Sequence, residues 1–529
     1  MSDAQPQAGE RWRPRANPWL IAVTVTLAAF MEILDTTIVN VSLPHIAGSM
    51  SVSYDDATWT LTSYLVANGI VLTISGWLGT LLGRKRYFLI CIASFTICSF
   101  LCGMAQSLPQ LIVFRLLQGF FGGGLQPNQQ SIILDTFEPE QRGRAFSVTA
   151  VATIVAPVLG PTLGGYITDN WSWRWIFFIN LPVGVLMLFG VFHLVEDPPW
   201  ARRERQPIDY IGLGLIALGL GCLQVVLDRG EDADWFGSPL IRVLATLAAI
   251  GIIGAIVWLT FLAKQPVVRL ACFKDRNFAL GSFCIFAMAS ILYSSAVVIP
   301  QLAQEVLGYT AFLAGLILSP GALLVCFMIP LVSRAMSRVE TRYLVAFGFF
   351  SLGVALIYSH GLAPDLDFNT LVLIRLAQTF GLGLLFVPIS TLTYSTLPQE
   401  LNRDGAALYT MLRNVAGSIG ISIASAMVIE RSQVRQAYLA GHLTPFDQPY
   451  VETIARNART LMTIGTNGVA PADAQQMAVG MMNQTLHQQA AVLAYTDVFA
   501  FCAIAAFCVV PIAFLFRGTR GGGGAAAAH

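Results

Sequence analysis

Residues 19–44 read WLIAVTVTLAAFMEILDTTIVNVSLP, an apolar stretch with a carboxylate, Asp35, about two thirds of the way along it. The stretch is long enough to cross a bilayer as one helix, which takes about 20 residues. Ionisable side chains are costly in hydrocarbon, so they usually face a protein interior or a water-filled cavity on an ion, proton or substrate pathway. The stretch therefore predicts a membrane-spanning helix with a functional carboxylate.

Composition places the whole chain in the membrane. It has 529 residues, of which 55% are hydrophobic and 12% charged, with a mean hydropathy of +0.65. A formal net charge of +1 gives no basic surplus that would favour nucleic acid. The chain lacks GxxxxGK[ST], HExxH and GxSxG motifs, and its cysteines have no metal-ligand spacing. We expect no enzyme activity, no metal, no cofactor and no nucleic-acid partner.

Apolar runs of about 20 residues predict an all-α polytopic protein with fourteen transmembrane helices. The predicted spans are 19–43, 57–80, 87–105, 109–132, 144–167, 175–195, 209–228, 238–263, 277–300, 312–333, 342–360, 368–391, 406–429 and 493–516. With a cytoplasmic N-terminus, the inner loops and the two terminal segments together hold 21 of the 31 Lys and Arg residues, as the positive-inside rule requires. Both termini are therefore predicted to be cytoplasmic.

An internal repeat divides the chain. LIVFRLLQG at 111–119 recurs as LVLIRLAQ at 371–378, at matching depth and topology, which indicates two parallel six-helix halves. The predicted domains are a cytoplasmic segment 1–18, an N-terminal half 19–196, a linker with two extra helices 197–264, a C-terminal half 265–517 that includes a long outer loop 431–492, and a flexible tail 518–529.

Four motifs in order resemble those of the major facilitator superfamily, specifically its 14-helix EmrB/QacA-type drug:proton antiporters. They are LDTTIVNVSLP at 34–44, RxxQG at 115–119, GPTLGG at 160–165 and WRWIFFINLPVG at 173–184, and the resemblance covers essentially the whole chain. The family's loop motif is imperfect at 76–86, because Thr80 stands where an Asp is common.

The resemblance implies a protein of the bacterial inner membrane that exports small drug-like molecules in exchange for protons. It also implies a periplasmic adaptor (membrane fusion protein) and an outer-membrane channel as partners, besides the lipid bilayer. The outer segment 431–492 contains an amphipathic stretch, 474–489, that either docks such an adaptor or lies on the protein's own surface or the membrane interface.

Asp35, Glu32 and Arg115 are the candidate proton-coupling residues. Counted along their helices, Asp35 and Arg115 lie roughly 9 to 14 Å inside the outer face and can pair. Glu32, three residues before Asp35, lies on the same side of its helix. Movement between a cationic and an apolar environment lets a carboxylate load and release a proton. A fixed ion pair that only orders helix packing remains the alternative.

Two further groups are predicted from polar and small residues in the spans. The candidate cavity residues are Asn40, Gln118, Gln126, Gln129, Arg375 and Gln378; the candidate gating or helix-packing residues are Gly160, Pro161, Gly164, Gly165, Arg84, Lys85 and Arg413. Interhelical hydrogen bonds, or snorkelling for Arg413, would explain several of them equally well. Arg375 has no carboxylate counterpart in the first helix of its half.

These residues predict proton-coupled export of amphipathic or lipophilic compounds by alternating access, with Asp35 as the proton carrier. Three alternatives stay open. One is a dedicated exporter of a single metabolite such as a siderophore, lipid or antibiotic. A passive facilitator and a transporter-like sensor are the others.

Overall fold

The computed structural model describes residues 14–197, 209–231, 233–264, 266–361, 367–441, 443–444, 446–464 and 470–517. Most of the predicted segment 1–18, the linker residues 198–208 and the predicted tail 518–529 lie outside these ranges. The described chain is helical, with no β-strand in these ranges.

The helices follow the predicted apolar runs. In chain order they are α1 (Pro18–Met50), α2 (Tyr54–Leu82), α3 (Arg84–Met104), α4 (Leu108–Gly122), α5 (Leu125–Thr136), α6 (Pro139–Asn170), α7 (Trp175–Phe178), α8 (Asn180–Leu194), α9 (Tyr210–Arg229), η1 (Trp235–Gly237), α10 (Pro239–Val257), η2 (Trp258–Leu262), η3 (Leu270–Lys274), α11 (Arg276–Gln301), η4 (Leu302–Val306), α12 (Ala311–Ala335), α13 (Thr341–His360), α14 (Phe368–Gly383), α15 (Phe386–Thr393), η5 (Gln399–Leu401), α16 (Asn402–Ala440), α17 (Gln448–Ile464) and α18 (Pro471–Ala513).

Local sequence sets several of these boundaries. Asn17 caps α1 by accepting a hydrogen bond from the Trp19 backbone, and Pro18 takes the first helical position, which needs no donor. Asp275 caps α11 in the same way. Gly83 has φ 84°, a left-handed conformation that lets the chain turn directly from α2 into α3.

The number of spans agrees with the prediction once the broken helices are counted. Within the described residues, twelve helices are long and apolar enough to cross a membrane. Helix α6 adds a thirteenth span when its two parts, which are bent by 42° after Pro157, are counted together. The predicted span 109–132 corresponds to α4 and α5, which the pair Gly123–Gly124 separates.

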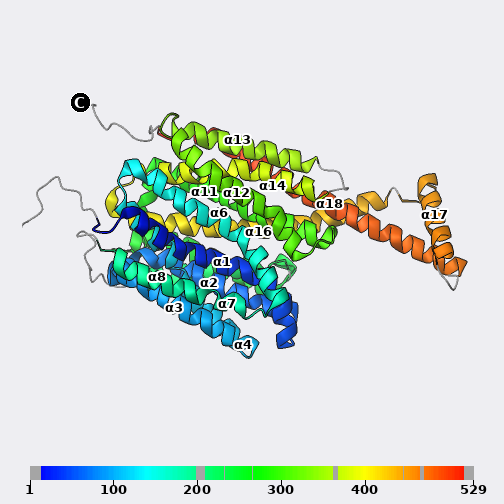
Figure 1. The fold of residues 1–529 in the computed structure, drawn as a ribbon, viewed down its shortest axis with the longest axis horizontal. Helices are drawn as coiled ribbons and strands as arrows, with labels where there is room; N and C mark the ends of the chain where they lie inside the picture. The colour runs from blue at the N-terminus through cyan, green and yellow to red at the C-terminus, as the bar shows by residue number, and fades with distance from the viewer. Residues whose placement is uncertain are drawn as a thin grey trace, which may run out of the picture.

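Two helical halves lie side by side (Figure 1). In the first, α1 packs on α6 and α8, and α4 packs on α2 and α3; in the second, α11 packs on α16, and α13 on α18. The halves meet where α6 contacts α12, and where α16 contacts α2 and α5. The confirmed arrangement is therefore an all-α bundle of two halves, with the α9/α10 pair packed against α2.

The two ends of the bundle differ. Helix α1 begins and α18 ends at one end, which we call the termini end. At the opposite end, the last part of α16, α17 and the first part of α18 project as a helical arm (Figure 1). The predicted outer loop 431–492 is thus largely helical, and its amphipathic stretch 474–489 is part of one continuous helix, α18.

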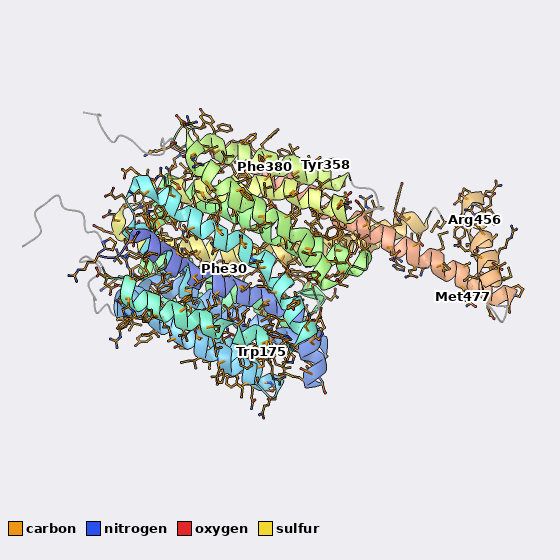
Figure 2. All side chains as sticks on the ribbon, in the orientation of Figure 1. Phe30, Trp175, Tyr358, Phe380, Arg456 and Met477 are labelled. Atoms are coloured by element: carbon orange, nitrogen blue, oxygen red, sulfur yellow. The ribbon has the colours of Figure 1, made fainter. Side chains whose placement is uncertain are left out.

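The surface of the bundle is apolar, as a lipid-facing surface must be. Trp175, Tyr358 and Phe380 point outward from it, with 40–67% of each side chain exposed (Figure 2). On the arm, Arg456 and Met477 are exposed instead (Figure 2). The arm has its own small core, formed by Ile454, Ala458, Ala474 and Ala478.

Candidate functional site

A cavity of about 810 Å³ lies between the two halves. Its wall reaches from Glu32, in the middle of α1, to His45 near the arm end, about 20 Å at 1.5 Å per residue. His45 and Asp169 lie 4.0 Å apart there, and both side chains are more than half exposed. The cavity therefore opens at the end of the bundle opposite the termini.

Beside the cavity, Asp35 is fully buried within the N-terminal half. Arg115 Nη1 donates to its Oδ2 at 2.6 Å, while Gln118 and Asn180 donate to its Oδ1 at 3.0 and 2.7 Å. Three donors and a guanidinium charge match a carboxylate anion. Asp35 itself is not on the cavity wall, whereas Arg115 is.

Arg115 is held on several sides. Its Nε donates to the Thr60 carbonyl at 3.2 Å, its Nη1 also reaches Gln118 Oε1 at 2.9 Å, and its guanidinium carbon lies 4.2 Å from the centre of the Tyr64 ring. The predicted pair of Asp35 with Arg115 thus exists, and Gln118 belongs to it.

Glu32 does line the cavity. Asn68 donates to its Oε1 at 3.0 Å, and Gln126 of α5 donates to its Oε2. Gln126 in turn accepts a hydrogen bond from Arg413 of α16, whose side chain is 3% exposed. A polar chain therefore crosses from the C-terminal half to the carboxylate of Glu32, which we call the cross-half chain (Arg413, Gln126 and Glu32).

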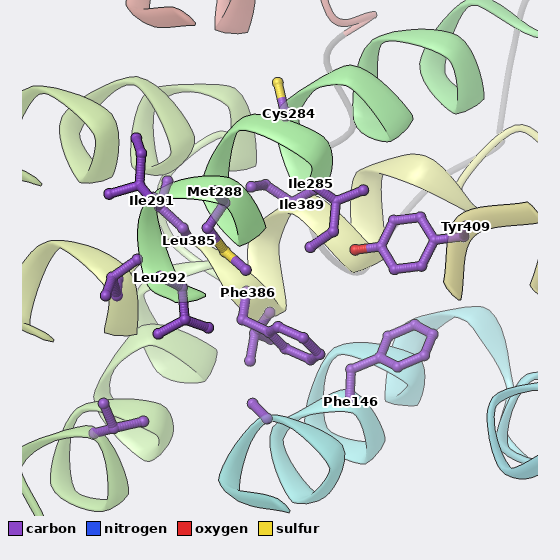
Figure 3. Close-up of a cluster of buried hydrophobic side chains, with 14 of the residues drawn as sticks. Phe146, Cys284, Ile285, Met288, Ile291, Leu292, Leu385, Phe386, Ile389 and Tyr409 are labelled. Atoms are coloured by element: carbon purple, nitrogen blue, oxygen red, sulfur yellow. The ribbon is translucent and has the colours of Figure 1, made fainter. Parts of the chain in front are cut away.

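Below the cross-half chain, buried aromatic rings close the path toward the termini end. Phe146 of α6 stacks on Tyr394 with ring centres 5.9 Å apart, and Tyr394 contacts Tyr409 at 5.5 Å. Figure 3 shows Phe146 and Tyr409 within the surrounding apolar cluster, on helices of opposite halves. Thr410 of α16 adds a hydrogen bond to Gln130 of α5 at 3.1 Å. The bundle is closed on this side and open on the other.

The remaining predicted cavity residues divide into two groups. Asn40 lines the cavity. Gln129 instead donates to Thr149 at 2.7 Å, inside the N-terminal half. Arg375 and Gln378 are buried in the C-terminal half, where they donate to Ser295 at 2.9 Å and Ser359 at 3.2 Å. The structure places these three in interhelical hydrogen bonds rather than on the cavity wall.

The two arginines occupy equivalent places in the repeat. Arg115 meets Asp35, and Arg375 meets Ser295, in each case 80 residues earlier in the chain. Serine thus takes the position of the carboxylate in the C-terminal half. Among the described residues, Arg375 has no carboxylate partner like Asp35, as the missing carboxylate predicts.

The small residues of α6 face in two directions. A Cβ at Gly160 would collide with Thr37, and one at Gly164 would lie 2.8 Å from the Ile38 side chain. These two glycines therefore let α6 approach α1 closely. Pro161 and Gly165, one residue further along, line the cavity instead.

The charges of the predicted loop motif stay within the N-terminal half. Arg84 forms a buried ion pair with Asp135 of α5. Lys85 donates from Nζ to the Phe192 carbonyl at 2.6 Å and from its backbone to Asp197 at 3.0 Å. Thr80, at the position where an Asp is common, donates to the Gly76 carbonyl of its own helix.

Sequence reasoning missed several residues of the site. Asn180, which completes the shell of Asp35, was visible as an amide inside the apolar motif at 173–184. Asn68 is likewise an isolated amide in the span 57–80. Gln224 and Asp228 of the inserted helix α9 also line the cavity. A polar residue inside an apolar span was the available signal in each case.

The model of the Major Facilitator Superfamily matches residues 25–421. The chain belongs to this superfamily. As a major facilitator it is a multi-pass membrane transporter and not an enzyme.

Relatives cover nearly the whole chain. The multidrug export protein EmrB of Escherichia coli (strain K12) is 36% identical over 513 residues, 96% of this chain and 97% of its own. The fatty acid resistance protein FarB of Neisseria gonorrhoeae is 34% identical over 506 residues, 95% of this chain and 97% of its own. The predicted resemblance to EmrB-type proteins is confirmed.

Solved structures share the fold of this major facilitator. The proton:xylose symporter XylE bound to 6-bromo-6-deoxy-D-glucose has a TM-score of 0.58 at 14% identity, covering 95% of this chain and 97% of its own. The human organic anion transporter MFSD10 (TETRAN) has a TM-score of 0.58 at 12% identity, covering 93% of this chain and 100% of its own.

Proposed function

We propose that this transporter exports amphipathic or lipophilic drug-like compounds in exchange for protons, by alternating access of its two halves. The observation that carries the proposal is the cavity between the halves, with Glu32 on its wall and the buried Asp35–Arg115 pair directly behind. Relatives named for multidrug export and for resistance support the same direction of transport.

The charge of the cavity favours cationic substrates. Four carboxylates line it, on Glu32, Asp169, Asp228 and Glu305. Among the described residues that line it, Arg115 is the one arginine, and the contact with Asp35 balances that charge. Apolar lining side chains complete the wall, which suits the lipophilic part of a substrate; among them are Leu61, Leu65, Leu72, Val297 and Ile421.

Proton entry begins at Glu32. In the conformation described, Glu32 faces the open cavity and Asp35 lies one helical turn behind it. A proton from the arm side reaches Glu32 first and passes to Asp35, the carrier, when Arg115 moves away from it. Protonation of Asp35 removes the anion that holds Arg115, so the two events depend on each other.

Protonation of Glu32 also weakens the contact between the two halves on the termini side. Arg413 is anchored to the N-terminal half through Gln126, which is bonded to the carboxylate of Glu32. Neutralising Glu32 weakens the electrostatic attraction along the cross-half chain. The halves then separate at the termini end, and the empty transporter returns to face the compartment from which substrate is loaded.

We place the protein in the bacterial inner membrane, with both termini cytoplasmic and the arm in the periplasm. The clusters of Arg and Lys at the termini end, such as Arg84 with Lys85 and Arg334, support this orientation. The arm supports an adaptor contact, because Met477 and Met481 of α18 are about half exposed there. A membrane fusion protein would link the exporter to an outer-membrane channel.

A dedicated exporter is the second candidate, and the name of FarB favours it, because that relative is named for resistance to one chemical class. Efflux from proteoliposomes, driven by an imposed pH gradient, distinguishes the two. The proposal predicts gradient-dependent export of several unrelated lipophilic cations. Export of fatty acids alone would favour the dedicated exporter, and flux that is insensitive to the gradient would indicate a passive facilitator.

A further inference from the structure

The inserted helix α9 lies between the bundle and its partner α10. It packs on α2 and contacts α16, while α10 covers its other side. The α9–α10 contact is close, because Gly219 and Gly251 face each other with no side chain between them. Helix α10 presents Ile250, Ile253 and Ile256 outward, each more than half exposed. Helix α10 thus faces lipid, and α9 reaches the interior.

Polar residues are confined to one end of α9. From Tyr210 the helix is formed by apolar residues and glycine until Gln224, and Asp228 and Arg229 follow. Gln224 and Asp228 are four residues apart, so they share one face. Both line the cavity. A helix that only filled space or contacted lipid would have no use for an amide and a carboxylate on this face.

The two charges at the end of α9 make different contacts. Asp228 accepts a hydrogen bond from Thr62 of α2 and contributes to the cavity wall. Arg229 is not on the wall; it donates to Thr58 at 2.7 Å and lies over the ring of Trp59, 4.8 Å from its centre. The cavity therefore receives the carboxylate of α9 and not its guanidinium.

We infer that α9 forms a polar subsite near the opening of the cavity, in which Asp228 and Gln224 bind the cationic group of a lipophilic substrate. The inference rests on the proposed function. Asp228 bonds Thr62, whereas Glu32 bonds Asn68, six residues or about 9 Å further along α2. The subsite therefore acts on which substrates bind and leaves proton coupling unchanged. It gives the inserted helices a role in substrate binding.

Transport by proteoliposomes tests the role of the charge. Asp228→Asn keeps an oxygen that can accept from Thr62, so α9 stays tied to α2. For tetraphenylphosphonium we expect the KM of this variant to rise about tenfold, because the attraction of the carboxylate for the cation is lost. The kcat and the dependence on the pH gradient should not change. For a neutral dye such as Nile red, the KM should change less than twofold. Glu231→Gln is the matched control, because Glu231 is a nearby carboxylate outside the cavity wall that bonds Trp235.

A labelling experiment tests the place of the subsite independently of transport. In protein with its nine cysteines replaced, Gln224→Cys should react with an impermeant methanethiosulfonate added from the arm side. Saturating tetraphenylphosphonium should slow that reaction at least fivefold. Phe236→Cys, whose native side chain is 65% exposed in η1 beyond the arm end of α9 and absent from the cavity wall, should react from the same side and show no such protection.

The outcomes separate the two proposals. If the wild type transports the cation but Asp228→Asn behaves like Glu231→Gln and Gln224→Cys is not protected, the inference is wrong and the exporter proposal stands. Equal loss for cationic and neutral compounds would mean that Asp228 only anchors α9, which also overturns it. A wild type that moves no cation at all refutes the proposed function itself.

Discussion

Removing Arg413 should shift the protein away from the conformation described here. Arg413 donates to Gln126 across the interface between the halves and is buried. A hydrogen bond from a charged donor contributes roughly 1.5–3 kcal/mol. Because about 1.4 kcal/mol corresponds to a factor of ten, Arg413→Met should change the ratio of the two conformers about 10- to 100-fold in favour of opening at the termini end.

Distances between two spin labels measure this shift. In a cysteine-free background, labels at Gln141 of α6 and Gln399 of η5 are exposed and belong to different halves. Arg413→Met should populate a longer distance than the wild type, and Glu32→Gln should do the same, because it removes the other charge of the cross-half chain.

Arg375→Met is the matched control. Arg375 is another buried arginine of the C-terminal half, but it donates to Ser295 within the same half. Its removal should leave the distance distribution close to that of the wild type. If Arg413→Met and Glu32→Gln both keep the wild-type distribution while remaining folded, the cross-half chain does not hold the termini side closed.

Two further substitutions test the packing of the N-terminal half by thermal unfolding in detergent. Gly160→Ala should lower the free energy of unfolding by about 1–3 kcal/mol, because the added methyl group collides with Thr37. Gly48→Ala is the control and should not lower it, because a Cβ there meets no atom within 4 Å. Equal effects of the two substitutions would contradict the close contact of α6 with α1. Arg84→Gln should lower the free energy of unfolding by about 3–5 kcal/mol, because Asp135 loses its buried partner. Unchanged stability would show that the ion pair does not stabilise the fold.

Much of the fold could be predicted because the signals are local. Apolar length fixes the spans, and the repeated RxxQ run fixes the two halves. Where the prediction and the structure differ, local signals competed with longer-range packing. Residues 431–492 are polar enough to suggest a loop, yet α16 and α18 continue into them. Ile454 and Ala458 of α17 pack on Ala474 and Ala478 of α18, and Arg435 of α16 forms an ion pair with Asp497 of α18.

The site was only partly predictable. Asp35 and Arg115 could be paired because both lie at similar depth in apolar helices. Which amides face the cavity could not be predicted, because that depends on the rotation of each helix; Gln126 reaches Glu32, whereas Gln129 points to Thr149.

The contact of Arg413 with Gln126 joins residues 287 positions apart in the chain. A sequence pattern cannot predict this contact, because the contact depends on how the two halves pack against each other. The same holds for α9, because only the packing of α9 against α2 places its polar end on the cavity wall.

Proton exchange is the central claim, and the most direct measurement is export of a lipophilic cation from proteoliposomes under an imposed pH gradient, together with the proton movement it causes. The account predicts that the wild type couples the two fluxes and that Asp35→Asn abolishes gradient-driven export while still binding the cation. Full coupled export by Asp35→Asn would contradict the assignment of Asp35 as the proton carrier.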